Sequence, residues 1–238
     1  MHGNAGSRVD ANPVVRVLLP MNITVLALDF SGCGKSEGEY ISLGHYEQDD
    51  IRTVVRHLRN EGRTSLISLW GRSMGAVTAV LYTASDPSVA GVVLDSPFSK
   101  LPSLMLELAT RVRLNIGGYN IPALPATIAG VALSVIRSSI RKRHDFDIDK
   151  LDAASAAANC YCPALFGHGD EDDFIVEEHS ETIKNNWAGD CHMILFSASH
   201  NSQRPSSWFK SAAIFTSRIL AVGVKDADSL FDFDEDGD

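Results

Sequence analysis

The sequence predicts an α/β fold: a mostly parallel sheet flanked by helices, with an inserted helical cap. Short apolar runs alternate with amphipathic helical segments, which is typical of a parallel sheet. One long middle segment, residues 98–158, breaks this alternation. The chain has 238 residues, of which 45% are hydrophobic, and this is enough for one sizeable core.

The expected strands are near-continuous runs of apolar or β-branched residues, as in a sheet covered on both faces. They span residues 23–29, 65–70, 89–95, 164–167 and 193–196. Two helices are indicated by apolar residues at one-face spacing. These residues are Ile51, Val54, Val55 and Leu58 in the first helix, and Trp208, Ala212, Phe215 and Ile219 in the second.

We expect one domain over residues 1–224, with the cap inserted at about 98–158. The cap sequence shows no convincing strand, only helical or irregular patterns with three prolines and Gly117-Gly118. Residues 225–238 are acidic and of low complexity, which predicts a solvated, disordered tail.

Composition argues against a nucleic-acid-binding, zinc-binding or membrane-spanning protein. The net charge of −9 argues against a nucleic-acid partner, because neutralising phosphates takes clustered Lys and Arg. Cys33, Cys160, Cys162 and Cys191 are scattered and lack zinc-ligand spacing, as expected for reduced thiols. The first residues show no signal peptide, and the most apolar stretch, 121–136, falls short of the roughly 20 residues of a spanning helix. We expect a soluble, cytoplasmic protein.

Ser73 is the candidate nucleophile. It is the centre of Gly71-Arg72-Ser73-Met74-Gly75, between a predicted strand and helix-compatible residues 76–84. A serine on a strained strand-to-helix turn needs small neighbours, and the turn places its Oγ at the positive end of a helix.

A serine nucleophile needs a base, and the base needs a carboxylate to orient it. His200 follows the last predicted strand and is the candidate base, whereas the other histidines are expected to be solvated or structural. After the strand at 164–167 come four adjacent acids, any of which could orient His200: Asp170, Glu171, Asp172 and Asp173.

These motifs resemble the α/β-hydrolase superfamily, specifically its serine-aminopeptidase-like (hydrolase-4) group of plant and protist proteins. The matching segments, in order, are His2-Gly3-Asn4-Ala5-Gly6, Asp29-Phe30-Ser31-Gly32-Cys33-Gly34-Lys35-Ser36, Gly71 to Gly75, Leu94-Asp95-Ser96, His168-Gly169-x-x-Asp172 and His200-Asn201-Ser202-x-Arg204-Pro205. They span nearly the whole chain.

The resemblance implies an α/β-hydrolase fold and hydrolysis of an ester, thioester or peptide without a metal or cofactor. The last position of its His-Gly-x-x-Asp pattern is the acid, which selects Asp172. The backbone N–H groups of Met74 and Asn4 are the expected oxyanion hole.

The resemblance also implies that part of the fold is missing. In the family, the His-Gly loop leaves the end of a central strand, with further strands before it. His2 is the second residue here, so we expect a truncated start, or a degenerate copy, with an unpaired gap between the strands at 23–29 and 65–70.

Two other motifs do not fit the sites they resemble. Gly32-Cys33-Gly34-Lys35-Ser36 ends like a phosphate-binding loop, but Asp29 occupies the position of that loop's first glycine. The acidic run that ends in Asp236-Gly237 opens like a calcium loop, but the chain ends before the bidentate Glu.

Three functions remain open: a carboxylic-ester or thioester hydrolase, an aminopeptidase, and an inactive binding scaffold. Residues 98–144 hold a single carboxylate, Glu107, but seven cations: Lys100, Arg111, Arg113, Arg137, Arg141, Lys142 and Arg143. A substrate ammonium calls for carboxylates, so this basic cap favours a small-molecule acyl ester over a peptide; the alternative is a solvated face. The cap also suggests peripheral membrane contact.

Overall fold

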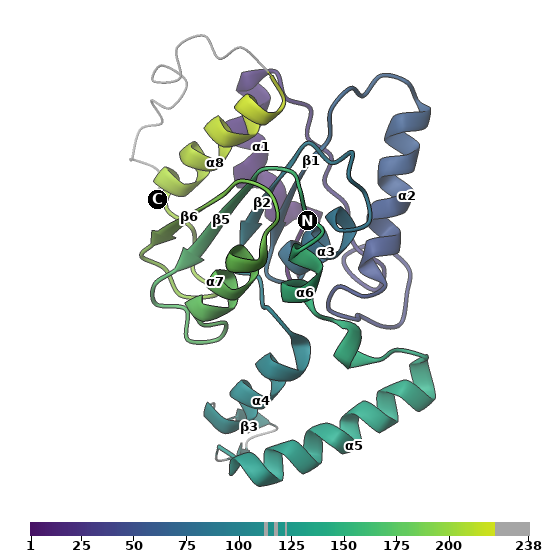
Figure 1. Cartoon of the computed structure of the whole chain (residues 1–238), viewed down its shortest axis with the longest axis vertical. Helices are drawn as coiled ribbons and strands as arrows, with labels where there is room; N and C mark the ends of the chain where they lie inside the picture. The colour runs from purple at the N-terminus through teal and green to yellow at the C-terminus, as the bar shows by residue number, and fades with distance from the viewer. Residues whose placement is uncertain (112–113, 117–118, 122, 222–238) are drawn as a thin grey trace.

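Four parallel strands form the central sheet of the computed structural model, which describes residues 1–111, 114–116, 119–121 and 123–221 (Figure 1). The strands are β1 (Ser68–Arg72), β2 (Gly91–Asp95), β5 (Ala164–Gly169) and β6 (Cys191–Phe196), in the spatial order β1-β2-β5-β6. Four of the five predicted strands are thereby confirmed, as is the α/β fold class.

The strand register brings the functional segments to one edge of the sheet. Arg72 at the end of β1 is opposite Asp95 at the end of β2, and Asp95 is opposite Gly167 of β5. The loops that follow these strands therefore start at similar heights, so side chains far apart in sequence can meet there.

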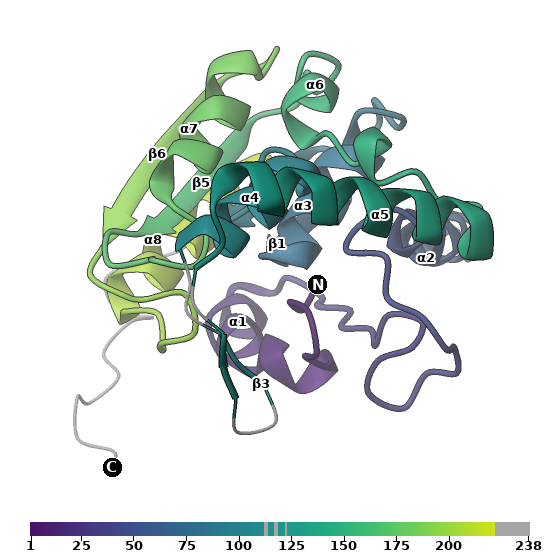
Figure 2. The ribbon, with the colours of Figure 1, turned by 90° about the horizontal axis from the view of Figure 1, so that it is seen from below.

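Helices cover both faces of the sheet (Figures 1 and 2). One face carries α2 (Glu47–Asn60), α3 (Met74–Thr83), α6 (Ala153–Ala157) and α7 (Glu177–Asn186). The other carries α1 (Asn12–Leu18) and α8 (Ser206–Ile219). The helices predicted from the one-face patterns correspond to α2 and α8, whose patterned residues Ile51, Val55, Trp208 and Ala212 are buried.

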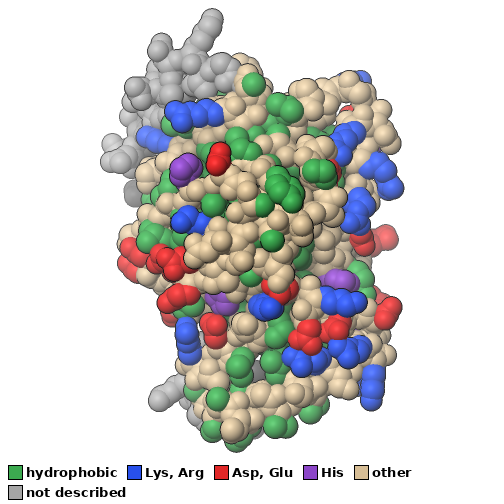
Figure 3. Space-filling view, viewed as in Figure 1, with side chains coloured by type: hydrophobic (Ala, Val, Ile, Leu, Met, Phe, Trp, Pro, Cys, Tyr) green, Lys and Arg blue, Asp and Glu red, His purple; other side chains and the backbone are tan. Residues whose placement is uncertain are grey.

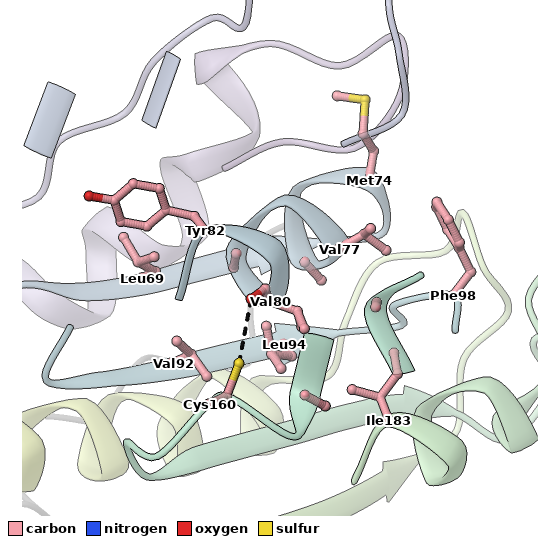
Figure 4. Close-up of a cluster of buried hydrophobic side chains, with 14 of the residues drawn as sticks. Leu69, Met74, Val77, Val80, Tyr82, Val92, Leu94, Phe98, Cys160 and Ile183 are labelled. Atoms are coloured by element: carbon pink, nitrogen blue, oxygen red, sulfur yellow. Dashed lines mark hydrogen bonds between the residues drawn. The ribbon is translucent and has the colours of Figure 1, made fainter. Parts of the chain in front are cut away.

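The main core lies between the sheet and α3. Figure 4 shows Val77 and Val80 of α3 beside Val92 and Leu94 of β2, and all four side chains are fully buried. Cys160 joins this cluster and donates from Sγ to the Val80 carbonyl at 3.5 Å. Because α3 is apolar on nearly every side, it is held as an internal helix, and this fixes the position of its first turn.

The prediction of a strand at residues 23–29 is wrong, because this segment forms no backbone pairing with a neighbouring strand. Apolar character alone does not make a strand, because a strand also needs a neighbour with which to exchange backbone hydrogen bonds. Within the described residues, only Met1 pairs beside the outer edge of β1, donating to the Trp70 carbonyl and accepting from Arg72 N–H. Ile23 instead packs beside α1 and α8, in a small cluster with Ala213. Short 3₁₀ helices flank α1, η1 (Arg8–Ala11) and η2 (Leu19–Met21).

The cap is mostly helical, and it lies below the sheet in Figure 1. It contains α4 (Leu101–Arg111), α5 (Ala126–His144) and η3 (Ile148–Lys150). The expectation of no strand is wrong, because β3 (Leu114–Ile116) and β4 (Tyr119–Ile121) form an antiparallel pair. Three-residue strands are too short to show an alternating pattern, and the Gly-Gly pair between them in sequence is a hairpin signal.

The acidic tail at 225–238, with its calcium-loop-like run, lies outside the described residues, as do Arg113 and Gly117-Gly118. Among the helices that the structure describes, none has the length and apolar character needed to cross a membrane.

Candidate active site

Ser73 lies on a sharp turn between β1 and α3. Its backbone has φ +51° and ψ −118°, a conformation unfavourable for a residue with a side chain, and its N–H donates to the Asp95 carbonyl at 2.7 Å. The two glycines of the motif are required because other backbone atoms lie where a Cβ would be. A Cβ on Gly71 would lie 2.2 Å from the Gly75 carbonyl oxygen, and one on Gly75 would lie 2.6 Å from the Met1 and His2 carbonyl oxygens.

His200 lies between Ser73 and Asp172. Its Nε2 is 3.2 Å from Ser73 Oγ, and its Nδ1 is 2.7 Å from Asp172 Oδ2. The imidazole is nearly buried, and the Phe174 ring lies beside it, with 5.1 Å between ring centroids. The structure thus brings together Ser73 and His200, predicted from the motif order, and Asp172, selected by the family resemblance.

Asp172 is the acid that reaches the histidine, and the neighbouring Asp170, Glu171 and Asp173 are exposed. Its second oxygen, Oδ1, accepts from Ile175 N–H at 2.8 Å and Phe174 N–H at 3.2 Å. Burial acts to raise the pKa of Asp172, but hydrogen bonds from His200 and Ile175 outweigh it and hold the pKa below its ordinary value. The carboxylate is therefore ionised at neutral pH.

His168, expected to be solvated or structural, is structural. It is fully buried, with Nε2 2.7 Å from the Ile175 carbonyl and Nδ1 2.7 Å from Ser180 Oγ. Because a carbonyl only accepts, Nε2 carries the hydrogen and Nδ1 accepts from the serine. His168 thereby fixes the loop whose N–H groups hold Asp172.

Both expected oxyanion donors are next to the serine in the fold. Met74 begins α3, so its N–H has no intrahelical acceptor. Asn4 lies in a turn closed by Gly6 N–H to the Gly3 carbonyl at 3.1 Å. A Cβ on Gly3 would lie 3.5 Å from Ser73 Cβ, so this turn passes directly beside the serine. Its position is fixed by His2, whose Nε2 accepts from Phe30 N–H at 3.1 Å.

The glycine-rich segment that resembles a phosphate loop surrounds a carboxylate of its own chain. Asp29 accepts from Lys35 N–H at 3.0 Å and from Arg8 N–H at 2.6 Å, and it pairs with the Arg8 guanidinium. These backbone hydrogen bonds lower the pKa of Asp29. Asp29 therefore ties this turn to the N-terminal segment that carries Asn4.

Sequence reasoning gave no role to two arginines beside the His200 loop. Arg72 Nη2 donates to the His200 carbonyl at 2.6 Å and to the Ser202 carbonyl at 3.3 Å. Arg204 is buried; it pairs with Asp95 through Nε and Nη2, and its Nη1 donates to the Ser199 carbonyl at 2.8 Å. The sequence does place Arg72 and Asp95 at the ends of apolar strands and Arg204 shortly after another. Charges in such positions are buried only when they are paired, so an ion pair could have been expected.

A second polar cluster joins the cap to the core. His179 of α7 accepts at Nδ1 from Ser99 Oγ at 2.8 Å, and its Nε2 lies 3.3 Å from Glu107 of α4. Glu107 also lies 3.9 Å from Arg111. The only carboxylate that the sequence places in 98–144 therefore has two cationic or titratable neighbours.

The four cysteines are free thiols, and burial raises the pKa of Cys160 to about 12 and of Cys162 to about 11. No group of three or more His, Cys, Asp or Glu residues in the described part of the chain is arranged to hold a metal ion.

A strand-to-helix serine elbow, a histidine and an acid on successive loops of a parallel sheet define the class of α/β-hydrolases. Within that class, the family model described as serine aminopeptidase, S33 (Hydrolase_4) matches residues 1–151, and the chain belongs to this family. The resemblance to the hydrolase-4 group is thereby confirmed.

Individual proteins also resemble this chain in sequence. An uncharacterised protein of Bacillus subtilis, YqkD, is 29% identical over 185 residues, which are 76% of this chain and 57% of that protein. The chain spans about half the length of the curated relatives it matches.

Many solved structures share the fold, and two of them are an esterase and a lipase. The Pyrococcus furiosus esterase Pf2001 superposes with a TM-score of 0.69 at 20% identity, over 92% of this chain and 80% of that one. A monoacylglycerol lipase of Paleococcus ferrophilus superposes with a TM-score of 0.62 at 20% identity, over 94% and 93%.

Proposed function

We propose that the protein is a serine hydrolase that cleaves carboxylic esters or thioesters through an acyl-enzyme on Ser73. The observation that carries this proposal is the double contact of His200, with Nε2 3.2 Å from Ser73 Oγ and Nδ1 2.7 Å from Asp172. These contacts suit a base that takes the serine proton while an ionised acid holds its tautomer.

In the proposed reaction, Ser73 Oγ attacks the acyl carbon while its proton passes to His200 Nε2. The negative charge that develops on the carbonyl oxygen is stabilised by the N–H groups of Met74 and Asn4. The intermediate collapses as His200 returns the proton to the departing alcohol or thiol. Water, deprotonated by His200, then attacks the acyl-enzyme and releases the acid and Ser73. No metal or cofactor takes part.

The charges of the cap favour an ester over a peptide substrate with a free ammonium group. An aminopeptidase needs an uncompensated carboxylate, whereas Glu107 lies 3.9 Å from the Arg111 guanidinium. An aminopeptidase remains the second candidate, because the matching family is described as serine aminopeptidase. An inactive scaffold is the third, since a binding protein could retain the same three side chains. We also propose a cytoplasmic location, which the four free thiols support.

Steady-state kinetics separate these candidates. We expect kcat/KM for medium-chain p-nitrophenyl esters to exceed that for aminoacyl p-nitroanilides by at least about 100-fold, a difference of about 2.7 kcal/mol in transition-state stabilisation. Comparable values on both substrates would favour the aminopeptidase. Activity on neither, or ester turnover that persists in Ser73→Ala, would reject the proposal.

A further inference from the structure

The outer face of cap helix α5 is apolar and exposed. Ile128, Val131 and Val135 follow each other at helical spacing, with exposed fractions of 53%, 67% and 64%. Ser134, Ser138 and Ser139 lie beside them in a shallow groove of about 570 Å³, which ends at Lys142 and Arg143. We name the surface formed by these eight residues the α5 face.

The opposite side of the same helix is also apolar, and it packs against the core of the protein. Ala129 is buried, and Leu133 and Ile140 pack against the main core. A surface helix of a globular protein usually carries polar residues opposite its buried stripe, so an exposed second stripe indicates a contact surface. Figure 3 shows hydrophobic side chains gathered at the lower end of the molecule, where Figure 1 places the cap.

The charges along α5 indicate what covers this face. The helix has no acidic residue, and its last turn contains Arg141, Lys142, Arg143 and His144. Arg137 and Arg141 are engaged by Asp149 and Asp147. Lys142 and Arg143 form no ion pair within the described residues, and they are the two cations at the end of the groove.

We propose that the α5 face docks on an anionic lipid bilayer. The aliphatic side chains enter the interface while Lys142 and Arg143 extend to acidic headgroups, as in interfacial helices. A second copy of the chain fits less well, because the α5 face offers no carboxylate with which Lys142 and Arg143 of the other copy could pair. The inference goes beyond the proposed hydrolase activity and does not depend on it.

Vesicle co-sedimentation of the full chain tests the proposal. We compare phosphatidylcholine vesicles with vesicles that contain roughly one third phosphatidylserine. The chain is expected to bind the anionic vesicles several-fold more strongly, and less so at high salt. Val135→Ser/Lys142→Glu should weaken this binding by at least about fivefold, since one basic residue alone accounts for that factor.

The matched control is Leu19→Ser/Arg16→Glu, which removes one exposed aliphatic and one exposed cation from the region of α1. It should bind vesicles like the wild type, as should Ser73→Ala, so a failed hydrolase proposal leaves this test intact. Absence of vesicle binding, or an equal loss in the control, would overturn the proposal. So would a wild-type dimer, seen without lipid by sedimentation velocity, that Val135→Ser/Lys142→Glu dissociates.

Discussion

Of four adjacent carboxylates only Asp172 contacts His200, and the structure gives the physical reason for this. The chain turns after β5 so that Asp172 N–H donates to the Gly169 carbonyl at 3.1 Å, and two further N–H groups then hold the Asp172 side chain. Asp170 and Asp173 are exposed on either side. A carboxylate that accepts three hydrogen bonds at a buried position is fixed in one rotamer, as orienting a histidine requires.

We therefore predict that Asp172→Asn lowers kcat by on the order of 10⁴, because the amide no longer selects the productive tautomer of His200. Asp170→Asn and Asp173→Asn are the matched controls and should stay within a few-fold of the wild type. Ester hydrolysis at neutral pH measures all three. If Asp170 or Asp173 proved the sensitive position, the assignment of the acid would be wrong.

The motif order predicted Ser73, His200 and the region of the acid, because each follows a predicted strand. The choice of Asp172 came only from the family resemblance, since spacing cannot tell which of several adjacent side chains turns inward. Arg72, Arg204 and His168 received no positioning role. Their roles depend on tertiary hydrogen bonds that link residues up to 130 positions apart, which sequence periodicity does not reveal.

At the scale of elements, the His200 loop is fixed to the carboxyl end of β2 by a buried ion pair. Arg204 and Asp95 are each less than 5% exposed, and Arg204 also holds two carbonyls of the loop. Removal of one partner leaves an uncompensated buried charge, which is strongly unfavourable.

We predict that Arg204→Met lowers the free energy of unfolding by about 3–5 kcal/mol, a large part of the total of about 5–15 kcal/mol. The double variant Asp95→Leu/Arg204→Met should lose clearly less than the sum of the two single variants, since no charge is then left unpaired. Urea unfolding of the four proteins measures the coupling. Additive losses would mean that the pair is not coupled.

The contact between Glu107 of α4 and His179 of α7 makes the stability of the folded chain depend on pH. Burial lowers the pKa of His179 below its ordinary value of 6.5 and outweighs the nearby Glu107, while Arg111 and His168 act in the same direction as burial. The unfolded chain therefore binds a proton at this histidine at a higher pH than the folded chain does. Stability from this group is present above about pH 6.5 and is lost as the pH falls through the lower folded pKa.

We accordingly expect His179→Gln to lose less stability than the wild type between neutral pH and pH of about 5. Ser99→Ala removes a hydrogen bond to the same imidazole but keeps the titratable group, so it should still lose more stability than His179→Gln as the pH falls. Thermal unfolding at a series of pH values provides the comparison. Parallel curves for wild type and His179→Gln would contradict this account of His179.

Four strands of the central sheet were predicted correctly, whereas one predicted strand is absent and the short β3–β4 pair was missed. Runs with a sheet neighbour, such as β2 and β5, became strands, whereas the equally apolar residues 23–29 did not. Pairing depends on what lies beside a segment, and this is information that the segment does not contain. The β3–β4 pair was missed for the opposite reason, because local pairing suffices there and each strand is only three residues long.

At the scale of the whole molecule, one edge of the sheet supplies the site and the cap lies below it. The elbow after β1, the loop after β5 and the loop after β6 converge, and Arg72 and Arg204 join the His200 loop to β1 and β2. The turn that contains Asn4 lies beside this serine elbow, with Gly3 against Ser73 and the His2 carbonyl against Gly75. The cap contributes Glu107 at its contact with α7 and the α5 face on its outer side, so site and proposed docking surface belong to different layers.

The central claim is that Ser73 is the covalent nucleophile, and active-site labelling tests it most directly. The chain is treated with a fluorophosphonate, which reacts with activated serines, and the adduct is located by peptide mass spectrometry. We expect one adduct, on the peptide that holds Ser73, absent in Ser73→Ala and strongly reduced in His200→Ala. An adduct on another serine, or labelling that persists in Ser73→Ala, would contradict the account.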